Sequence, residues 1–197
     1  MIDNYREVKN LLTFESGDDF YYLQILQRKK ENSEAGSNSR IIKNYFIGSI
    51  EYLDHKYDEI KDLCNLFNAR AYIRLNKRSY YNVSFKALVN ISNTIMNKDY
   101  INTSRAYERA VGQSHNNKKD KRWIVDLDEP YQLETEYLRE LQKIINECNP
   151  DGNKIKALIP SKNGLHIITN PFNLQEFSKY KYMLEIHKDN PTNLYIP

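Results

Sequence analysis

The chain has 197 residues, which suffices for one sizeable core or two small modules that share one, but not for two independent domains of average size. A hydrophobic fraction of 40% and 16 tyrosines exclude a largely disordered chain, which would lack the apolar surface needed to offset chain entropy. The net charge of +3 is too small to indicate nucleic-acid binding by itself, so the clustering of basic residues is more informative than their sum.

The cysteines and the N-terminus bear on the compartment. Cys64 and Cys148 lie in apolar helical patterns without metal-type spacing, which favours core residues in a reducing compartment over zinc ligands. The N-terminal sequence lacks the basic start and apolar centre of a signal peptide, and no apolar run reaches membrane-spanning length. We therefore expect a cytoplasmic protein that has no membrane partner.

Residues 1–115 predict a small α/β lobe. A short helical pattern in residues 5–12 is followed by the extended runs DFYYLQILQRKK and RIIKNYFIG, which predict a long hairpin. The insert between them, ENSEAGSNS, is typical of a turn or a mobile loop. Apolar residues at helical spacing predict helices in residues 49–67, 85–96 and 101–111, and ARAYIRLN alternates as a strand.

Basic residues gather in three runs that are candidates to face phosphate: QRKK (27–30), ARAYIRLNKR (69–78) and NKKDKR (117–122). A solvated surface is the simpler explanation for any one run taken alone. Within the second run, Arg74 and Lys77 are candidates for contacts with a single-stranded template, with tyrosines stacking on its bases.

The connector GQSHNNKKDK marks the boundary to a second lobe, residues 116–197. WIVDL predicts a strand, residues 133–148 predict a helix, and KIKALIP, SKNG and LHIIT predict a hairpin. A short helix around residues 174–180 and a strand in MLEIHKD complete the βαββαβ order of ferredoxin-like and RNA-recognition folds. We therefore expect an α+β protein with such a lobe, and NLYIP predicts one more edge strand.

Polar residues of the second lobe are expected to converge on one face of its sheet. Side chains alternate along a strand, so Asp126 and Asp128 point away from the helix-covered face. In the arrangement that we expect, the first strand is central, the third strand is antiparallel to it and the fourth is parallel. The end of the first strand, the start of the third and the end of the fourth then lie at one edge of the sheet. We therefore expect Asp126, Asp128, His166 and Asp189 to lie close together there.

Such convergence suits phosphoryl transfer. Magnesium takes a few carboxylates together with water and substrate phosphates, and two such ions about 3.5–4 Å apart activate an attacking hydroxyl and stabilise a leaving oxygen. In the hairpin SKNGLH, Gly164 permits a tight turn, while Ser161, Lys162 and His166 offer donors to phosphate oxygens.

Each of these features also has a purely structural explanation. An Asp-x-Asp before a proline commonly ends a strand, and SKNG makes an ordinary hairpin turn. Asp189, which precedes Asn190 and Pro191, fits turn chemistry equally well, and His187 fits a surface position better than a metal site. It is the combination of the motifs, in this order on this plan, that favours a site.

VDLD, SKNGLH and EIHKD resemble the three motifs of the archaeo-eukaryotic primase (primase-polymerase) superfamily. The resemblance implies an RNA-recognition-like catalytic lobe preceded by an α/β lobe. It implies that Asp126, Asp128 and Asp189 are catalytic ligands of Mg²⁺ or Mn²⁺, and that Ser161 and His166 contact nucleotide phosphates. Lys162 and Asn163 stand where the family commonly has small residues. The resemblance further implies either a minimal form, as in phages and plasmids, or dependence on a partner such as a replicative helicase.

Three hypotheses follow. The leading one is a DNA primase or primase-polymerase, which joins NTPs or dNTPs by template-dependent nucleotidyl transfer on single-stranded DNA. The alternative is a non-catalytic single-stranded DNA-binding or replication-initiation protein of the same fold, whose binding depends on salt but not on metal. A metal nuclease would share the carboxylates but has no evident use for a triphosphate-binding hairpin.

Overall fold

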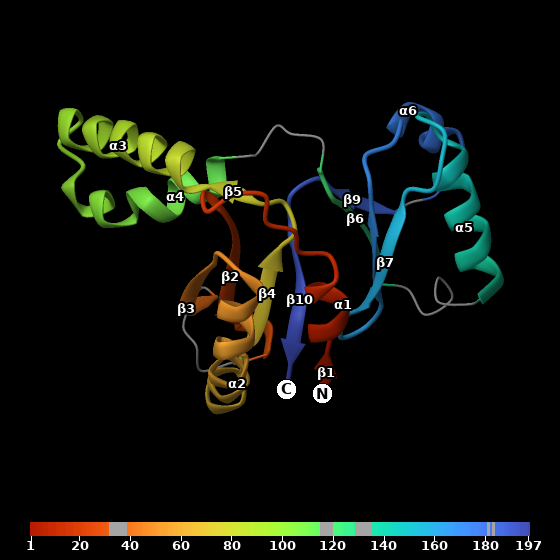
Figure 1. The fold of residues 1–197 in the computed structure, drawn as a ribbon, viewed down its shortest axis with the longest axis horizontal. Coiled ribbons are helices and arrows are strands. Elements are labelled where there is room, and N and C mark those ends of the chain that lie inside the picture. The colour runs from red at the N-terminus through yellow and green to blue at the C-terminus, as the bar shows by residue number, and fades with distance from the viewer. Residues whose placement is uncertain (32–38, 115–119, 129–134, 181, 183) are drawn as a thin grey trace.

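The computed structural model describes residues 1–31, 39–114, 120–128, 135–180, 182 and 184–197. Within them the protein is a mixed α/β fold with two antiparallel sheets, and a helical arm projects at one end (Figure 1). The predicted loop at residues 32–38 and the start of the helix predicted from residue 133 lie outside the described residues. In the part of the chain that is described, no helix is both long and apolar enough to cross a bilayer.

The first sheet has the strand order β1-β10-β4-β2-β3, with β5 paired to β2. Its strands are β1 (Ile2–Asp3), β2 (Asp19–Gln27), β3 (Arg40–Ile47), β4 (Arg70–Arg74), β5 (Arg78–Ser79) and β10 (Pro191–Ile196). β2 is an almost continuous apolar run because both of its faces are buried. Tyr21 and Leu23 belong to the core under helix α2, whereas Phe20 and Tyr22 face the helical arm.

Helix α2 (Ile50–Phe67) covers one face of this sheet, as its apolar spacing predicts. The Ser49 hydroxyl caps its start by accepting the Tyr52 N–H at 3.1 Å, and Asn68 ends it in the left-handed conformation at φ 43°. The buried residues recur at helical spacing, namely Leu53, Tyr57, Ile60 and Cys64. Helix α1 (Tyr5–Lys9) is shorter than predicted.

The helical arm consists of α3 (Tyr80–Met96), a 3₁₀ turn (Tyr100–Arg105) and α4 (Ala106–Gln113). α3 begins earlier than the helix predicted in residues 85–96, because the Ser79 hydroxyl accepts the Asn82 N–H at 3.1 Å and caps it. Val83 and Ala87 pack with Ala110 and Val111 of α4 in a small core that also contains β2 side chains.

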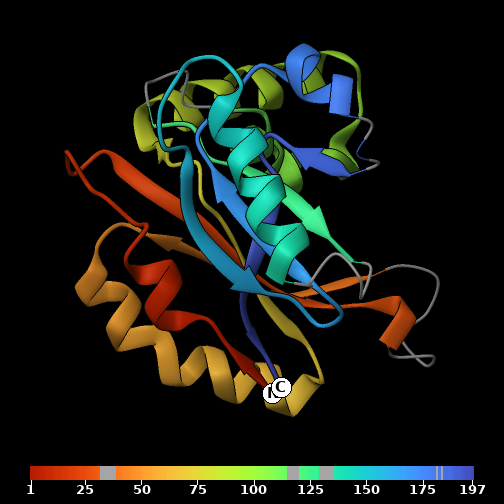
Figure 2. The ribbon, with the colours of Figure 1, turned by 90° about the vertical axis from the view of Figure 1, so that its right-hand side faces the viewer.

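The second sheet has the strand order β7-β8-β6-β9, with β6 (Trp123–Leu127), β7 (Ile155–Pro160), β8 (Leu165–Thr169) and β9 (Glu185–His187). Helix α5 (Thr135–Glu147) lies across its outer face, beside the short α6 (Leu174–Phe177) (Figure 2). The predicted alternation is confirmed, since Val125 and Leu127 pack with α5. The opposite face is not fully open, because Ile124, Ile159 and Ile168 join the core of the first sheet.

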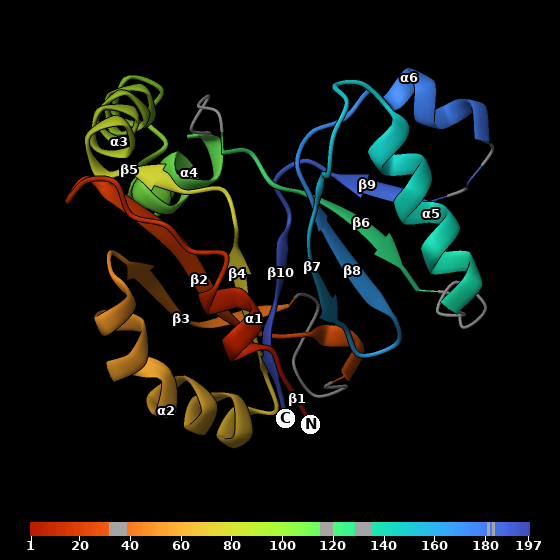
Figure 3. The same cartoon turned by 45° about the vertical axis from the view of Figure 1, so that its right-hand side comes forward.

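Two expectations about the strands were wrong. β9 runs antiparallel to β6, not parallel to it. The crossover through α6 returns β9 parallel to β8, and β8 is itself antiparallel to the strand between them. β10 does not extend the second sheet but lies between β1 and β4 in the first, where burial of nearly all its residues suits an inner strand. The second lobe is therefore inserted between α4 and β10 (Figure 3).

Candidate functional site

A cleft of about 620 Å³ lies between the two sheets. One wall comes from β6, β8 and the turn between β7 and β8, and the other comes from the region after β2, from β4 and from the start of β10. Its polar lining includes Arg28, Lys30, Glu31, Arg70, Asp126, Asp128, Ser161, Lys162, His166 and His187. The structure thus brings together five of the six residues that the sequence predicts for the site.

Asp126 lies on the inner strand β6, opposite His166 on β8. Its Oδ1 is 3.4 Å from His166 Nε2, and its Oδ2 is 3.8 Å from His187 Nε2. Thr192 Oγ1 lies 2.8 Å from His166 Nδ1 and orients the ring from its other side. Asp126 Oδ1 is nevertheless buried without a hydrogen bond from any described residue, because its contact with His166 lacks hydrogen-bonding geometry.

The electrostatics of this group follow from burial. Burial raises the pKa of Asp126 above its usual range, and the nearby His166 opposes the rise while Asp128 adds to it. Burial also lowers the pKa of His166, which Asp126 partly offsets, so the imidazole is biased toward its neutral form. A buried carboxylate with an unsatisfied oxygen is a group that a cation would stabilise.

Asp128 is exposed at the end of β6, and the SKNG turn packs directly on its backbone. The turn is closed by the Ser161 N–H, which donates to the Gly164 carbonyl at 3.0 Å. A Cβ at Gly164 would lie 1.7 Å from the Leu127 carbonyl oxygen. Glycine is therefore required at this position, because only glycine lets the SKNG turn and the Asp-x-Asp strand end approach so closely.

Glu31 is held between two cations at the cleft. Lys162 Nζ lies 2.9 Å from its Oε1, and Arg70 Nε donates to its Oε2 at 2.9 Å. Burial alone would raise the pKa of Glu31, but the hydrogen bonds from Lys162 and Arg70 outweigh it and lower the pKa. The arrangement shows that Lys162 and Arg70 together bind a planar anion, and it joins the two lobes across the cleft.

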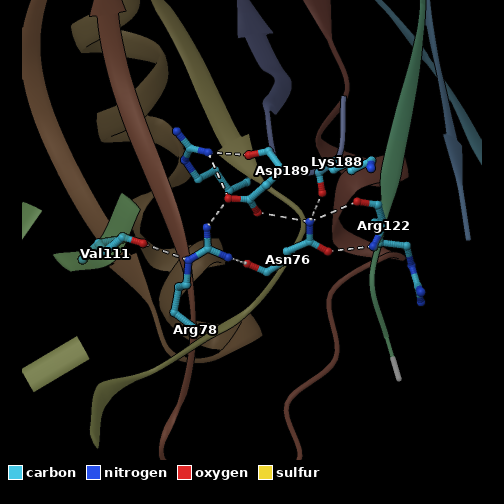
Figure 4. Close-up of polar contacts among 7 residues, drawn as sticks. Asn76, Arg78, Val111, Arg122, Lys188 and Asp189 are labelled. Atoms are coloured by element: carbon cyan, nitrogen blue, oxygen red, sulfur yellow. Dashed lines mark hydrogen bonds and ion pairs between the residues drawn. The ribbon is translucent and has the colours of Figure 1, made fainter. Parts of the chain in front are cut away.

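Asp189 is not brought to the other two aspartates. Antiparallel β9 carries it toward the start of β6, where Asp126 and Asp128 do not lie, and it is not among the residues that line the cleft. Its Oδ2 accepts from Arg78 Nη2 at 2.6 Å and from Arg74 Nη1 at 3.3 Å (Figure 4). The expected three-carboxylate cluster is absent from the described residues, where no three His, Cys, Asp or Glu side chains are grouped to hold a metal.

The Asp189 network joins the parts of the fold. Asn76 Nδ2 donates to Asp189 Oδ1 at 3.1 Å, to the Lys188 carbonyl at 2.9 Å and to the Arg122 carbonyl at 3.0 Å (Figure 4). The fully buried Arg78 also donates from Nε to the Val111 carbonyl of α4 at 3.0 Å. The second sheet, the first sheet and the helical arm thus meet at one carboxylate, which gives Asp189 a structural role.

The two predicted template contacts do not face the cleft either. Arg74 is directed to Asp189, and Lys77 is buried, with its Nζ 3.0 Å from Glu15 Oε1 and 3.5 Å from Asp19 Oδ2. Among the described residues, the basic members of the runs that line the cleft are instead Arg28 and Lys30 from the first run and Arg70 from the start of the second. The clustering of basic residues marks both runs as candidates to face phosphate, but it does not show which members of a run reach the cleft.

Two of the three predicted carboxylates, Asp126 and Asp128, lie in the cleft and are the candidate ligands for a divalent cation. Asp126 supplies an unsatisfied buried oxygen, and Asp128 lines the same cleft. One or two carboxylates, completed by water and substrate phosphates, suffice for Mg²⁺.

Comparisons of the chain with protein-family models, with curated proteins and with solved structures returned no match.

Proposed function

We propose that the cleft binds a nucleoside triphosphate with a divalent cation and that the protein is a template-dependent nucleotidyltransferase of the primase-polymerase kind. The observation that carries the proposal is the position of Asp126. Its unsatisfied buried oxygen lies in the same cleft as Asp128, Lys162 and His166. Nucleotidyl transfer requires a cation site and hydrogen-bond donors to the triphosphate oxygens in the same cleft.

Asp126 and Asp128 would hold Mg²⁺ or Mn²⁺, which supplies charge neutralisation at the triphosphate and activation of a primer 3′ hydroxyl. The hydroxyl oxygen attacks the α-phosphorus and releases its proton to water, a new P–O bond forms, and the bond between the α-phosphorus and the leaving pyrophosphate oxygen breaks. Neutral His166, oriented by Thr192, donates a hydrogen bond to a phosphate oxygen. Ser161 and Lys162 on the turn add donors from the same side.

The strand order supports the same proposal. A central β6 flanked by β8 and β9, with helices in the β6–β7 and β8–β9 connections, is compatible with the ferredoxin-like plan of the expected catalytic lobe. Under this proposal, VDLD and SKNGLH have the roles that the family resemblance implies for them. The third motif, which contains Asp189, has become part of the scaffold, so two carboxylates remain for the metal.

Primer synthesis and extension on single-stranded DNA, with NTPs or dNTPs and either metal, test the proposal. We expect product from the wild-type protein and its loss in Asp126→Asn. Asp58→Asn is the matched control, because this carboxylate is 90% exposed on α2, away from the cleft. Absence of product from the folded wild-type protein under all conditions, or full activity in Asp126→Asn, would contradict nucleotidyl transfer.

A non-catalytic DNA-binding protein is the second candidate. The observation that favours it is that the described residues contain only two of the three expected carboxylates in the cleft, beside Arg28, Lys30 and Arg70. Binding of single-stranded DNA that weakens with salt and ignores both metal and nucleotide would support it. Cleavage of DNA in the presence of Mg²⁺ or Mn²⁺ and without nucleotide would instead indicate the nuclease.

A further inference from the structure

Helix α3 of the arm is apolar on two faces. One face is buried on α4 and the sheet through Val83 and Ala87. The other exposes six large apolar side chains, with exposed fractions between 52% and 79%. These residues form what we call the α3 stripe: Tyr81, Phe85, Leu88, Val89, Ile95 and Met96. A helix that is apolar on opposite faces is normally covered on both.

The stripe is continuous along the helix. At about 100° per residue its members span about 120° of the helix surface, opposite the buried face. Tyr81, Phe85, Leu88 and Ile95, with Ser92 between the last two, follow the alternating four-and-three spacing of a coiled-coil seam. The rings of Tyr81 and Phe85 lie 4.7 Å apart, so an aromatic pair is presented at one end. Aromatic side chains are common anchors of protein interfaces.

The size of the stripe fits a protein interface. With about 200 Å² for a fully exposed large side chain, the six residues present roughly 700 Å² of apolar surface. The largest apolar patch of a typical monomer covers about 300–600 Å². Each partner of a standard interface contributes about 800 Å², with a range of roughly 600–1,000 Å². The stripe is therefore larger than a monomer normally leaves exposed and large enough for a stable contact.

The near absence of charged residues on α3 indicates which kind of partner fits the stripe. Lys86 is the one charged residue in the sequence of α3, so the stripe offers no pattern of charges for nucleic acid or for an anionic lipid surface. An uncharged partner helix with the same seam spacing has the complementary character, and a second copy of α3 supplies it. Two-fold pairing of identical patches is also the commonest form of protein oligomer.

We propose that a second copy of this chain packs on the α3 stripe, forming a two-fold dimer through paired α3 helices. The arm lies at the end of the molecule remote from the second sheet (Figure 1). Pairing through it brings two copies together and leaves each cleft open. The dimer goes beyond the proposed nucleotidyl transfer and does not depend on it.

Sedimentation velocity of the full chain between about 1 and 100 µM tests the dimer, because interfaces of this size have dissociation constants in the micromolar range or below. We expect the wild-type protein to be dimeric. Phe85→Glu combined with Leu88→Glu would bury unpaired carboxylates in the interface and raise the dissociation constant at least about 100-fold. Asn93→Glu is the control, because Asn93 is exposed on the same helix outside the stripe.

Circular dichroism checks that the double variant keeps its helices. If it does not, Met96→Lys gives an independent reading, because this side chain is 79% exposed and contributes little to the core. A wild-type protein that stays monomeric at the highest concentration would overturn the proposal, even if it then bound another protein or lipid vesicles. Dimerisation that persists in the folded stripe variants would overturn it as well.

Discussion

A substitution of Asp189 distinguishes a structural role of this carboxylate from a role as a metal ligand. Its carboxylate is 16% exposed and pairs with Arg78, whose side chain is fully buried. In Asp189→Ala the Arg78 guanidinium stays buried and loses a charged partner, a change that typically costs about 3–5 kcal/mol. The remaining hydrogen bonds of Arg78, to the carbonyls of Val111 and Asn76, do not neutralise its charge. We therefore expect Asp189→Ala to lower the free energy of unfolding by about 3–5 kcal/mol.

The assay is urea or thermal unfolding of Asp189→Ala, Asp126→Asn and wild type, with Asp58→Asn as the surface control. About 3–5 kcal/mol corresponds to a fall in Tm of roughly 6–20 °C for a chain of this size. Asp126→Asn should leave stability unchanged or raise it, because it removes the charge from a buried carboxylate with an unsatisfied oxygen. Asp58→Asn should leave stability unchanged.

The opposite pattern would refute this reasoning. If Asp189→Ala unfolds like wild type but loses metal-dependent activity, Asp189 acts as a ligand and the network around it is incidental. Manganese binding, followed by electron paramagnetic resonance of the folded variants, separates the two roles without an activity assay. Loss of manganese binding should occur in Asp126→Asn and not in Asp189→Ala.

Three further results are expected. Gly164→Ala places a methyl group against the Leu127 carbonyl and should cost about 1–3 kcal/mol and weaken nucleotide binding by calorimetry, whereas Gly17→Ala, with open space around its Cα, should do neither. Glu31→Gln frees the two cations that hold this carboxylate, so nucleotide affinity should rise about fivefold, as loss of about 1 kcal/mol of competing ion pairing implies. Because the folded-state pKa of Glu31 is lowered from 4.5, its ion pairs contribute stability above that pH and lose it as pH falls through the folded pKa. Acid unfolding curves of wild type and Glu31→Gln should therefore converge at low pH, and a constant gap between them would contradict this.

The local part of the site was predictable, because it depends on neighbours along the chain. Strand alternation put Asp126 on the face opposite the helix-covered core, and the SKNG turn between two apolar strands put Lys162 and His166 beside it. These relations follow from the pleat and from a short hairpin, whatever the rest of the chain does.

The position of Asp189 was predicted wrongly because the direction of β9 was predicted wrongly. The helical crossover through α6 makes β9 parallel to β8 and therefore antiparallel to β6, which the expectation of a parallel fourth strand overlooked, and this direction places Asp189 in the Arg78 network instead of the expected metal site. The participation of Arg70 in the cleft also depends on how the two sheets meet, which no local pattern encodes. Sequence therefore predicted the content of one wall of the cleft but not the wall opposite.

The place of β10 has a consequence for synthesis of the protein. Residues 191–196 form an inner strand between β1 and β4, so the first sheet cannot close until they have left the ribosome. Until then the nascent chain exposes the edge of β4, which is able to pair with other chains. The first sheet is therefore completed only when β10 is available, and removal of residues 191–196 would take out an inner strand of this sheet.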